Sequence, residues 1–401
     1  MMAAIAAAKN GHQVILYEKN EKLGKKIFIT GKGRCNVTNA CDTEAFFANV
    51  MSNPKFLYSA VYGFDAFQTM SFFEEAGCRL KTERGERVFP VSDHSSDVIK
   101  ALQKKMDSLG ITVLFQNEVK KVLTEKETVT GVLLAGGKAE ACDAVIVATG
   151  GISYESTGST GDGYLFAEQT GHRLVERRPS LVPLNCAESF CKELMGLSLK
   201  NVEVTLYHKD KEIYKDFGEM LFTHFGVSGP LILSASCKYV QKAFKEPALL
   251  TIDLKPALSE EQLDKRILRD FEEELNRNFA NSLDKLLPKS LIPVVVSLSG
   301  IARETKVNQI SREQRATLVN VIKHLRLNVT SFRPLEEAIV TSGGIKVSEI
   351  DPSNMASKLV SGLFFAGEII DVDAFTGGFN LQIAWATGYA AGMAAGAAEK
   401  E

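Results

Sequence analysis

Residues 364–388 read FFAGEIIDVDAFTGGFNLQIAWATG, and this stretch decides the fold. The apolar residues 362–366 predict a buried strand, and Gly377-Gly378 precedes a helix predicted over about 380–395. Glycines let such a helix begin close to a ligand. There, its free N–H groups and positive dipole favour a carbonyl that gains negative charge. Small residues in the helix favour close packing on a sheet. The stretch therefore predicts the last strand and helix of a Rossmann-like domain.

The start of the chain resembles the second part of a Rossmann unit. Residues 2–9 predict a helix, Asn10-Gly11 ends it, and residues 14–17 predict a buried strand followed by Glu18. In a Rossmann unit the acidic residue follows the G-x-G-x-x-G loop by about 20 positions. Counting back from Glu18 puts that loop before residue 1. We therefore expect a chain that begins inside the first helix, without the first strand and glycine loop.

Glu18 occupies the position where an acidic side chain accepts hydrogen bonds from ribose hydroxyls. A glutamate at the end of a strand is often only a solvated surface charge. Both interpretations of Glu18 stay open on the sequence alone.

A loop at 24–39 combines glycines with cations. Glycines allow backbone N–H groups to approach a ligand, and Lys and Arg offset phosphate charge, although a mobile basic surface loop has the same composition. Cys35 and Cys41 are spaced C-x5-C, whereas disulfide reductases use C-x4-C. A Cys35 that packs or contacts a ligand is therefore favoured over a catalytic disulfide.

Two further segments have ambiguous motifs. Residues 145–151, VIVATGG, predict a strand and a glycine turn that either crosses close to a dinucleotide or makes a tight connection. His224, in the segment 222–230, is either a general acid or a structural histidine. The segment lacks the G-x-S-x-G pattern of a serine hydrolase.

The order of strand and helix patterns along the sequence predicts a discontinuous α/β domain. Short alternating strands begin near residue 180, and a charged helical pattern covers 259–287. Near residue 333 the pattern of strands, glycine-containing loops and a helix, typical of a Rossmann-like domain, begins again. We predict an outer domain of 1–179 and 333–401, a β-barrel-like insert of 180–257 with about 293–332, and a helical insert of 258–292.

Composition narrows the class of protein. The net charge of −2 gives no global field for DNA or an anionic membrane, although a local basic patch remains possible. Seven dispersed cysteines and six histidines predict reduced thiols and no metal site. No apolar run is long enough to span a membrane, so we expect a cytoplasmic protein.

Taken together, these stretches resemble the BaiN/RdsA-like, or YhiN-like, flavoprotein family of NAD(P)- and FAD-dependent oxidoreductases, also known as the aminoacetone oxidase family. The resemblance covers nearly the whole chain and is carried by residues 16–39, 145–164, 221–230, 341–347 and 364–388. It implies a two-part FAD-binding domain interrupted by a β-barrel and a helical insert. The chain departs from the family at its N-terminus, where the family has the first strand and glycine loop.

The resemblance also implies roles for single residues. Glu18 would hold the adenosine ribose, Glu368 would meet the ribityl chain, and Thr149-Gly150 would line the adenine side. The loop around Cys35 would follow the flavin and its phosphates, and residues 378–381 would face the isoalloxazine. The predicted cofactor residues are Glu18, Lys19, Lys32, Gly33, Arg34, Cys35, Thr149, Gly150, Gly367, Glu368, Asp371, Gly378, Phe379, Asn380 and Leu381, with His224 and Cys35 as catalytic candidates.

Three functions remain open. The favoured one is reduction of a conjugated C=C by NAD(P)H through FAD, with a uridine of 23S rRNA as leading substrate and NAD(P)H docking only transiently. The second is a flavin oxidase of small amines or aminoketones that produces hydrogen peroxide. The third is a flavin-free binding protein that arose by loss of the phosphate loop.

Overall fold

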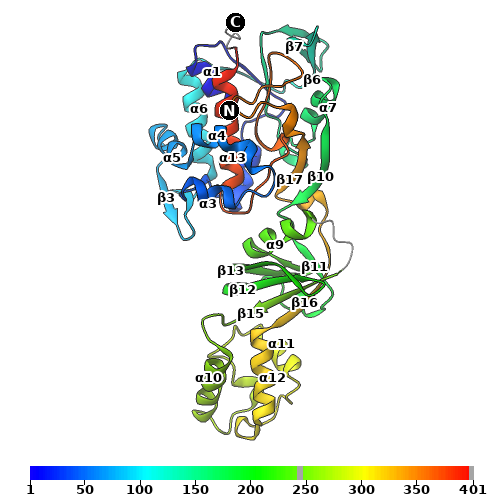
Figure 1. The fold of residues 1–401 in the computed structure, drawn as a ribbon. Coiled ribbons are helices and arrows are strands. Elements are labelled where there is room, and N and C mark those ends of the chain that lie inside the picture. Colours follow the sequence, from blue (N-terminus) through cyan, green and yellow to red (C-terminus); the bar gives the residue numbers. More distant parts are fainter. Residues whose placement is uncertain (242–246, 397–401) are drawn as a thin grey trace. The chain divides into compact units, whose positions relative to one another are not determined.

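The computed structural model describes residues 1–241 and 247–396. Contacts divide the chain into unit 1, Met1–Ser180 with Leu335–Glu401, and unit 2, Leu181–Pro334 (Figure 1). Each unit has its own hydrophobic core. The segments 242–246 and 397–401, which the predicted domains include, lie outside the described residues.

Unit 1 contains two pairs of parallel strands. Strand β1 (Ile15–Glu18) pairs with β5 (Thr112–Phe115), and β9 (Val145–Val147) pairs with β18 (Leu363–Phe365). Within the described residues no ladder joins the two pairs, so the parallel strands form two separate pairs. The predicted fold class is confirmed: unit 1 is a Rossmann-type α/β fold, and a β-barrel interrupts it in sequence.

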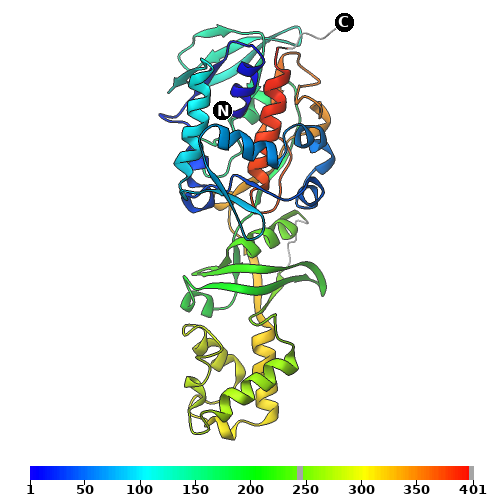
Figure 2. The same cartoon turned by 90° about the vertical axis from the view of Figure 1, so that its left-hand side faces the viewer.

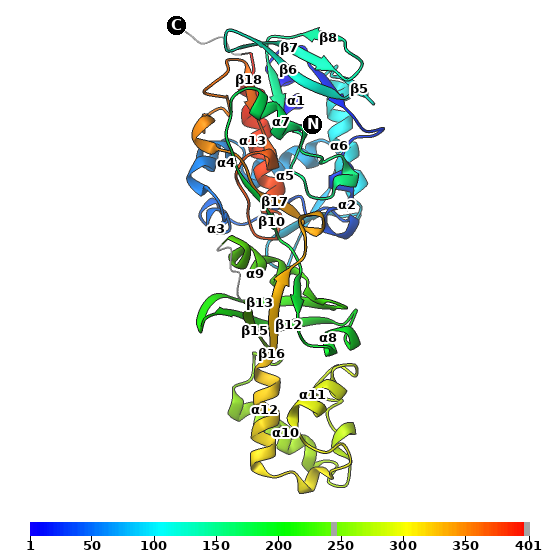
Figure 3. The ribbon, with the colours of Figure 1, turned by 90° about the vertical axis from the view of Figure 1, so that its right-hand side faces the viewer.

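Antiparallel strands complete the strand content of unit 1. A three-stranded meander follows β5, and its second turn lies at 135–138 (Figure 3). The strands are the meander β6 (Val119–Glu125), β7 (Thr128–Leu134) and β8 (Ala139–Ala141), the sheet β2 (Thr38–Asn39), β4 (Arg87–Pro90) and β3 (Leu80–Glu83), and the pair β10 (Leu174–Ser180) and β17 (Val340–Ile345).

Local capping explains where some helices of unit 1 begin. Helix α5 starts with a capping box in which Asp65 and Gln68 each accept a hydrogen bond from the other's backbone N–H. The helices of unit 1 are α1 (Met2–Lys9), α2 (Lys25–Ile29), α3 (Thr43–Ala48), α4 (Tyr58–Gly63), α5 (Ala66–Glu75), α6 (Ser95–Ser108), α7 (Asp162–Gln169) and α13 (Phe379–Ala394).

Helix α1 packs beside the C-terminal half of α13 (Figure 2). At Gly392 a Cβ atom would lie 2.3 Å from the carbonyl oxygen of Ala3, so only glycine permits this approach. The sequence predicted that the small residues of α13 serve packing on the sheet. Gly388 and Gly392 instead face another helix, α1.

Unit 2 is built on a closed barrel in the order β11-β14-β13-β12-β15-β16. The alternating pattern of β16 places Leu325, Leu327 and Val329 in the barrel core. The strands are β11 (Leu184–Cys186), β12 (Ser198–His208), β13 (Lys211–Thr223), β14 (Gly226–Ser228), β15 (Ala248–Asp253) and β16 (Leu325–Phe332).

The helices of unit 2 correct two details of the sequence prediction. Of the stretch 293–332 assigned to the barrel, only β16 belongs to it, because α11 and α12 occupy most of the rest. The periodic pattern 259–287 is one helix only as far as Glu272, and Leu275 beyond it is exposed. The helices are α8 (Phe190–Glu193), α9 (Pro230–Gln241), α10 (Glu260–Glu272), α11 (Ile292–Ser299) and α12 (Arg312–Lys323). In the described part of the chain, no helix has the length and apolar character needed to cross a membrane.

The contact between α1 and α13 predicts different effects for two glycines of one helix. Gly392→Ala forces a methyl group into the backbone of α1 and should lower the free energy of unfolding by about 1–3 kcal/mol. Gly388→Ala is the control, since its methyl group meets neighbours at 3.4 Å or more and alanine is the better helix former. Urea unfolding measures both changes, and equal stability of the two variants would contradict the packing argument.

Candidate functional site

The carboxyl ends of β9 and β18 lie side by side, because the two strands are parallel and in register from Val145 with Leu363 to Val147 with Phe365. Ligands of α/β folds bind at this edge. The backbone N–H of Gly367, just after β18, donates to the hydroxyl of Thr387 in α13 at 2.9 Å. This contact ties the strand end to the helix that follows it.

Glu368 is the centre of a polar network at this edge. Its Oε2 accepts from Lys26 Nζ at 2.7 Å, and its Oε1 accepts from the backbone N–H of Thr341 at 2.8 Å. The Ser153 hydroxyl lies 3.1 Å from Oε1 and accepts from Lys26 Nζ at 2.6 Å. Three distant segments thus converge on one carboxylate whose side chain is 17% exposed. Since a carboxylate has about four lone-pair positions, Glu368 retains capacity for a ligand hydroxyl.

A buried tyrosine lies close to this network. Tyr164 is 1% exposed, and its hydroxyl has no hydrogen-bond partner among the described residues. Burial raises the pKa of Tyr164, and the nearby charge of Glu368 raises it further. A buried polar atom without a partner is costly, so this hydroxyl is a donor available to a ligand.

The loop after Glu368 holds two further carboxylates. Burial raises the pKa of both Asp371 and Asp373. Asp371 accepts from Asn53 Nδ2 at 3.0 Å, and Asp373 accepts from the Ser180 hydroxyl at 2.7 Å. Asp373 is almost fully buried, which makes it an anchor of the loop.

Glu18 lies at the end of β1, as predicted, with one carboxylate oxygen engaged. Oε1 accepts from the backbone N–H and the side-chain amide of Asn20, at 2.9 and 2.8 Å. No hydrogen bond to Oε2 is formed by the described residues. Lys19, its neighbour, pairs with Asp162 at 2.5 Å. Glu18 therefore has an open oxygen for a hydroxyl, whereas the charge of Lys19 is already matched.

The loop predicted to line the cofactor begins as helix α2 and continues as a left-handed turn. Gly31 and Lys32 have φ values of 56° and 58°, and Cys35 has 60°. Left-handed conformation costs a non-glycine residue roughly 1–2 kcal/mol. Such strain gathers at functional sites.

Most cations of this loop already have partners, which weakens the argument from composition. Lys26 pairs with Glu368, and Lys25 lies 3.4 Å from Glu21. Arg34 forms ion pairs with Glu83 and Asp93. Lys32 is exposed, and none of the described carboxylates lies within ion-pair distance of it.

Cys35 does not have the character of a reactive thiol. It is fully buried, and burial raises its pKa to about 12. Cys35 and Cys41 are both free thiols. These properties do not favour Cys35 as a nucleophile, because the thiolate is the nucleophile. A catalytic role for Cys35 stays a prediction.

The N-terminus of α13 begins at Gly378, Phe379 and Asn380. Gly378 has a φ of 102°, and a Cβ there would lie 2.4 Å from the backbone carbonyl of Thr38. The protein's own backbone therefore requires this glycine, independently of any ligand. Asn380 closes the preceding loop through both backbone groups of Ala374. The N-cap residue Gly378 has no side chain that could accept from the first N–H groups of α13, which include that of Leu381.

The glycine turn after β9 is closely packed against the protein itself. A Cβ at Gly163, in α7, would lie 2.2 Å from Thr149 Oγ1. Gly150 has a φ of 77°. The short distance at Gly163 shows that the turn and α7 are tightly connected. Contact of Thr149-Gly150 with a dinucleotide stays a prediction.

His224 lies in unit 2, in the turn between β13 and β14. Its side chain is exposed, with its ring centre 5.0 Å from that of Phe225. Its role as a general acid stays a prediction. In the described residues no group of three or more His, Cys, Asp or Glu side chains could hold a metal ion.

Sequence reasoning included Lys26 among the cations of the loop at 24–39 but did not predict its contact with Glu368, and it missed Ser153, Thr341 and Tyr164 as members of this site. Lys26, Ser153 and Thr341 fall within the quoted motifs, but nothing in the spacing of those motifs indicates that they meet Glu368. The only available signal was the density of polar residues beside glycines at each strand end.

Fold and site together define a Rossmann-type α/β protein of the class that binds FAD. The chain belongs to the family described as HI0933-like protein Rossmann domain, whose model matches residues 1–394. This is a family of FAD-dependent oxidoreductases, so the resemblance read from the sequence is confirmed.

Two curated relatives match nearly the whole chain. The chain is 31% identical over 401 residues to the 3-dehydro-bile acid delta(4,6)-reductase of Clostridium scindens, covering 98% of this chain and 96% of that protein. It is also 31% identical over 405 residues to the ribosomal RNA dihydrouridine synthase of Haemophilus influenzae, covering 98% and 95%.

Among solved structures, the 3-ketosteroid delta1-dehydrogenase of Sterolibacterium denitrificans has a TM-score of 0.53 at 12% identity, covering 98% of this chain and 96% of that chain. At this identity the likeness shows the fold alone.

The environment of Cys35 predicts low reactivity. At pH 8 a thiol with a pKa of about 12 is ionised in roughly one molecule in ten thousand, so iodoacetamide should leave Cys35 unmodified in the native protein. Half-buried Cys41 is the internal control, and mass spectrometry of peptides reads both sites. Modification of Cys35 faster than Cys41 would contradict the buried, neutral thiol.

Proposed function

We propose that this protein is an FAD-dependent oxidoreductase in which NAD(P)H reduces a C=C bond conjugated to a carbonyl, with a uridine of 23S rRNA as leading substrate. One observation carries the proposal: the chain matches, from end to end, two relatives whose names describe a bile acid reductase and a dihydrouridine synthase. Both names describe addition of two hydrogens to a C=C bond. The rRNA substrate is the finer part of the proposal.

Bound FAD would supply the transfer of a hydride from NAD(P)H to one carbon of the double bond. A proton added to the other carbon completes the reduction and balances the charge. The residues of the chain would hold the flavin next to the double bond of the substrate, and they would stabilise the negative charge that develops on the flavin.

The residues present fit FAD. Glu18 Oε2 and the remaining lone pairs of Glu368 are acceptors for ribose and ribityl hydroxyls, and the Tyr164 hydroxyl is an unused donor beside Glu368. The uncapped N-terminus of α13 offers N–H groups and a positive dipole to a flavin carbonyl. In the left-handed loop, Lys32 has no described carboxylate within ion-pair distance, so its charge is available to a phosphate.

The other predicted cofactor residues enter the proposal as backbone or framework. Gly33 and Gly150 would offer backbone N–H groups, and Gly367, whose own N–H bonds to Thr387, would hold the end of β18 on α13. Asn380 and Asp371 would hold the loop before α13 in place. Lys19 and Arg34 would orient the surrounding carboxylates, because their own charges are matched by ion pairs.

Reduction kinetics test the reaction. In the absence of oxygen, NADH or NADPH should bleach the 450 nm band of the protein-bound flavin quickly, and aminoacetone should bleach it slowly. Deletion of the gene should remove one dihydrouridine from 23S rRNA. Fast bleaching by the amine with stoichiometric peroxide, together with an unchanged rRNA, would replace the reductase by the oxidase. A purified protein that binds no flavin would favour the flavin-free binding protein.

Tyr164→Phe tests the placement of FAD beside Glu368. Loss of an unsatisfied buried hydroxyl should leave the stability of the flavin-free protein equal or higher. Loss of one hydrogen bond to the cofactor should raise the FAD dissociation constant up to about tenfold. Tyr214→Phe, which removes a buried hydroxyl of unit 2 bonded to Asp216, is the matched control and should leave FAD affinity unchanged. Unchanged affinity in Tyr164→Phe would move the cofactor away from this hydroxyl.

A further inference from the structure

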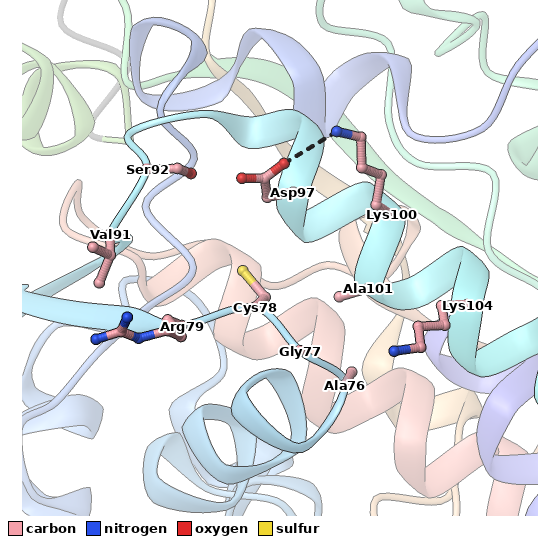
Figure 4. A pocket seen from close by; sticks show the side chains of 10 residues that line it. All are labelled: Ala76, Gly77, Cys78, Arg79, Val91, Ser92, Asp97, Lys100, Ala101 and Lys104. Carbon is pink, nitrogen blue, oxygen red and sulfur yellow. Dashed lines mark hydrogen bonds and ion pairs between the residues drawn. The ribbon is translucent and has the colours of Figure 1, made fainter.

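A hollow of about 440 Å³ lies on unit 1, and Figure 4 shows the side chains that line it. It is formed where α5 ends, where β4 leads into α6, and along the first turns of α6. Its lining residues are Ala76, Gly77, Cys78, Arg79, Val91, Ser92, Asp97, Lys100, Ala101 and Lys104. None of the predicted cofactor residues lines it.

The lining carries a surplus of positive charge. Three cations, Arg79, Lys100 and Lys104, face one carboxylate, that of Asp97, which gives a net charge of +2. Asp97 is matched by Lys100 at 3.3 Å (Figure 4). In the described part of the chain, Arg79 and Lys104 have no carboxylate within ion-pair distance.

Between these two cations the hollow presents apolar atoms. In Figure 4 the segment from Ala76 to Cys78 lies between Arg79 and Lys104. Cys78 is 3% exposed, and burial raises its pKa to about 11, so its thiol is uncharged near neutral pH. Ala101 and Val91 extend this apolar lining. Two unmatched cations beside an apolar floor suit a ligand that joins a phosphate to a flat or apolar group.

We propose that this hollow binds a nucleoside phosphate, whose sugar and base lie on the floor around Cys78, between Arg79 and Lys104. Its own phosphate would contact one of these two cations, and in a strand the phosphate of the next nucleotide would contact the other. The guanidinium of Arg79 offers a planar fork to phosphate oxygens, and Lys104 adds a point charge. The same chemistry is offered by a nucleotide within an RNA strand and by a free nucleotide. The proposal goes beyond the proposed reaction, and it is measured by binding without turnover, so its failure and that of the reductase are separate results.

The double variant Arg79→Ala with Lys104→Ala tests the hollow. A fluorescein-labelled 20-nucleotide oligouridylate is titrated with the FAD-loaded protein at several salt concentrations, and fluorescence anisotropy gives the dissociation constant. Loss of two phosphate contacts should reduce the slope of log K against log salt by about 1.4 and weaken binding by roughly 10- to 30-fold at 0.1 M NaCl. Uridine 5′-monophosphate, titrated by calorimetry, is the second probe.

A matched control changes the same amount of charge elsewhere on unit 1. Lys121 and Lys126 are exposed on the β6–β7 hairpin, and their double alanine variant should leave both binding and salt slope unchanged. The flavin spectrum and NAD(P)H oxidation should persist in both variants. Arg79→Gln with Lys104→Gln removes the charges but keeps more of each side chain, and it replaces the alanine variant if the latter is unstable.

The two probes distinguish the sources. Weaker oligouridylate binding with no measurable affinity for the monophosphate assigns the hollow to an RNA strand, and loss of monophosphate binding assigns it to a free nucleotide. Wild-type affinity for both probes in the double variant, or an equal loss in the control, overturns the proposal.

Discussion

The site of unit 1 depends on the hydrogen bonds that the carboxylate of Glu368 accepts. This carboxylate joins Lys26, which follows β1, to Ser153, which follows β9, and to Thr341 in β17. A partly buried carboxylate is stable only when its oxygens have donors, so these segments must assemble before the charge is tolerated. The network therefore holds these segments together at the edge where the parallel strands end. It also orients Glu368 and leaves one lone-pair position of its carboxylate unused.

The sequence predicted the elements around this carboxylate better than the contacts it makes. The strand expected over 362–366 is Leu363–Phe365, and the helix expected over about 380–395 is Phe379–Ala394. Both have local signals, an apolar run and a glycine pair. The pairing of Lys26 with Glu368 joins residues 342 positions apart. Periodicity and spacing report neighbours along the chain and carry no information about such a partner.

The same limit explains why composition misjudged two features of the site. Four cations beside three glycines suggested charge available to phosphate, yet Lys26 and Arg34 are matched by carboxylates from distant segments. Gly378 suggested close approach to a ligand, but the backbone of Thr38 already fills the space beside it. The type of a residue shows which interactions its side chain can form. Only the folded structure shows whether the protein itself already uses them.

The matched charges have a physical use in the left-handed loop. Lys32 and Cys35 adopt conformations that cost roughly 1–2 kcal/mol each, so the loop needs compensating contacts to hold its shape. The ion pairs of Arg34 with Glu83 and Asp93, together with burial of Cys35, supply such contacts from the protein itself. A ligand that meets this loop then spends little of its binding free energy on ordering it. In the proposed function Arg34 would therefore contribute to ligand affinity through the shape of the backbone, whereas the unmatched Lys32 would contribute through its charge.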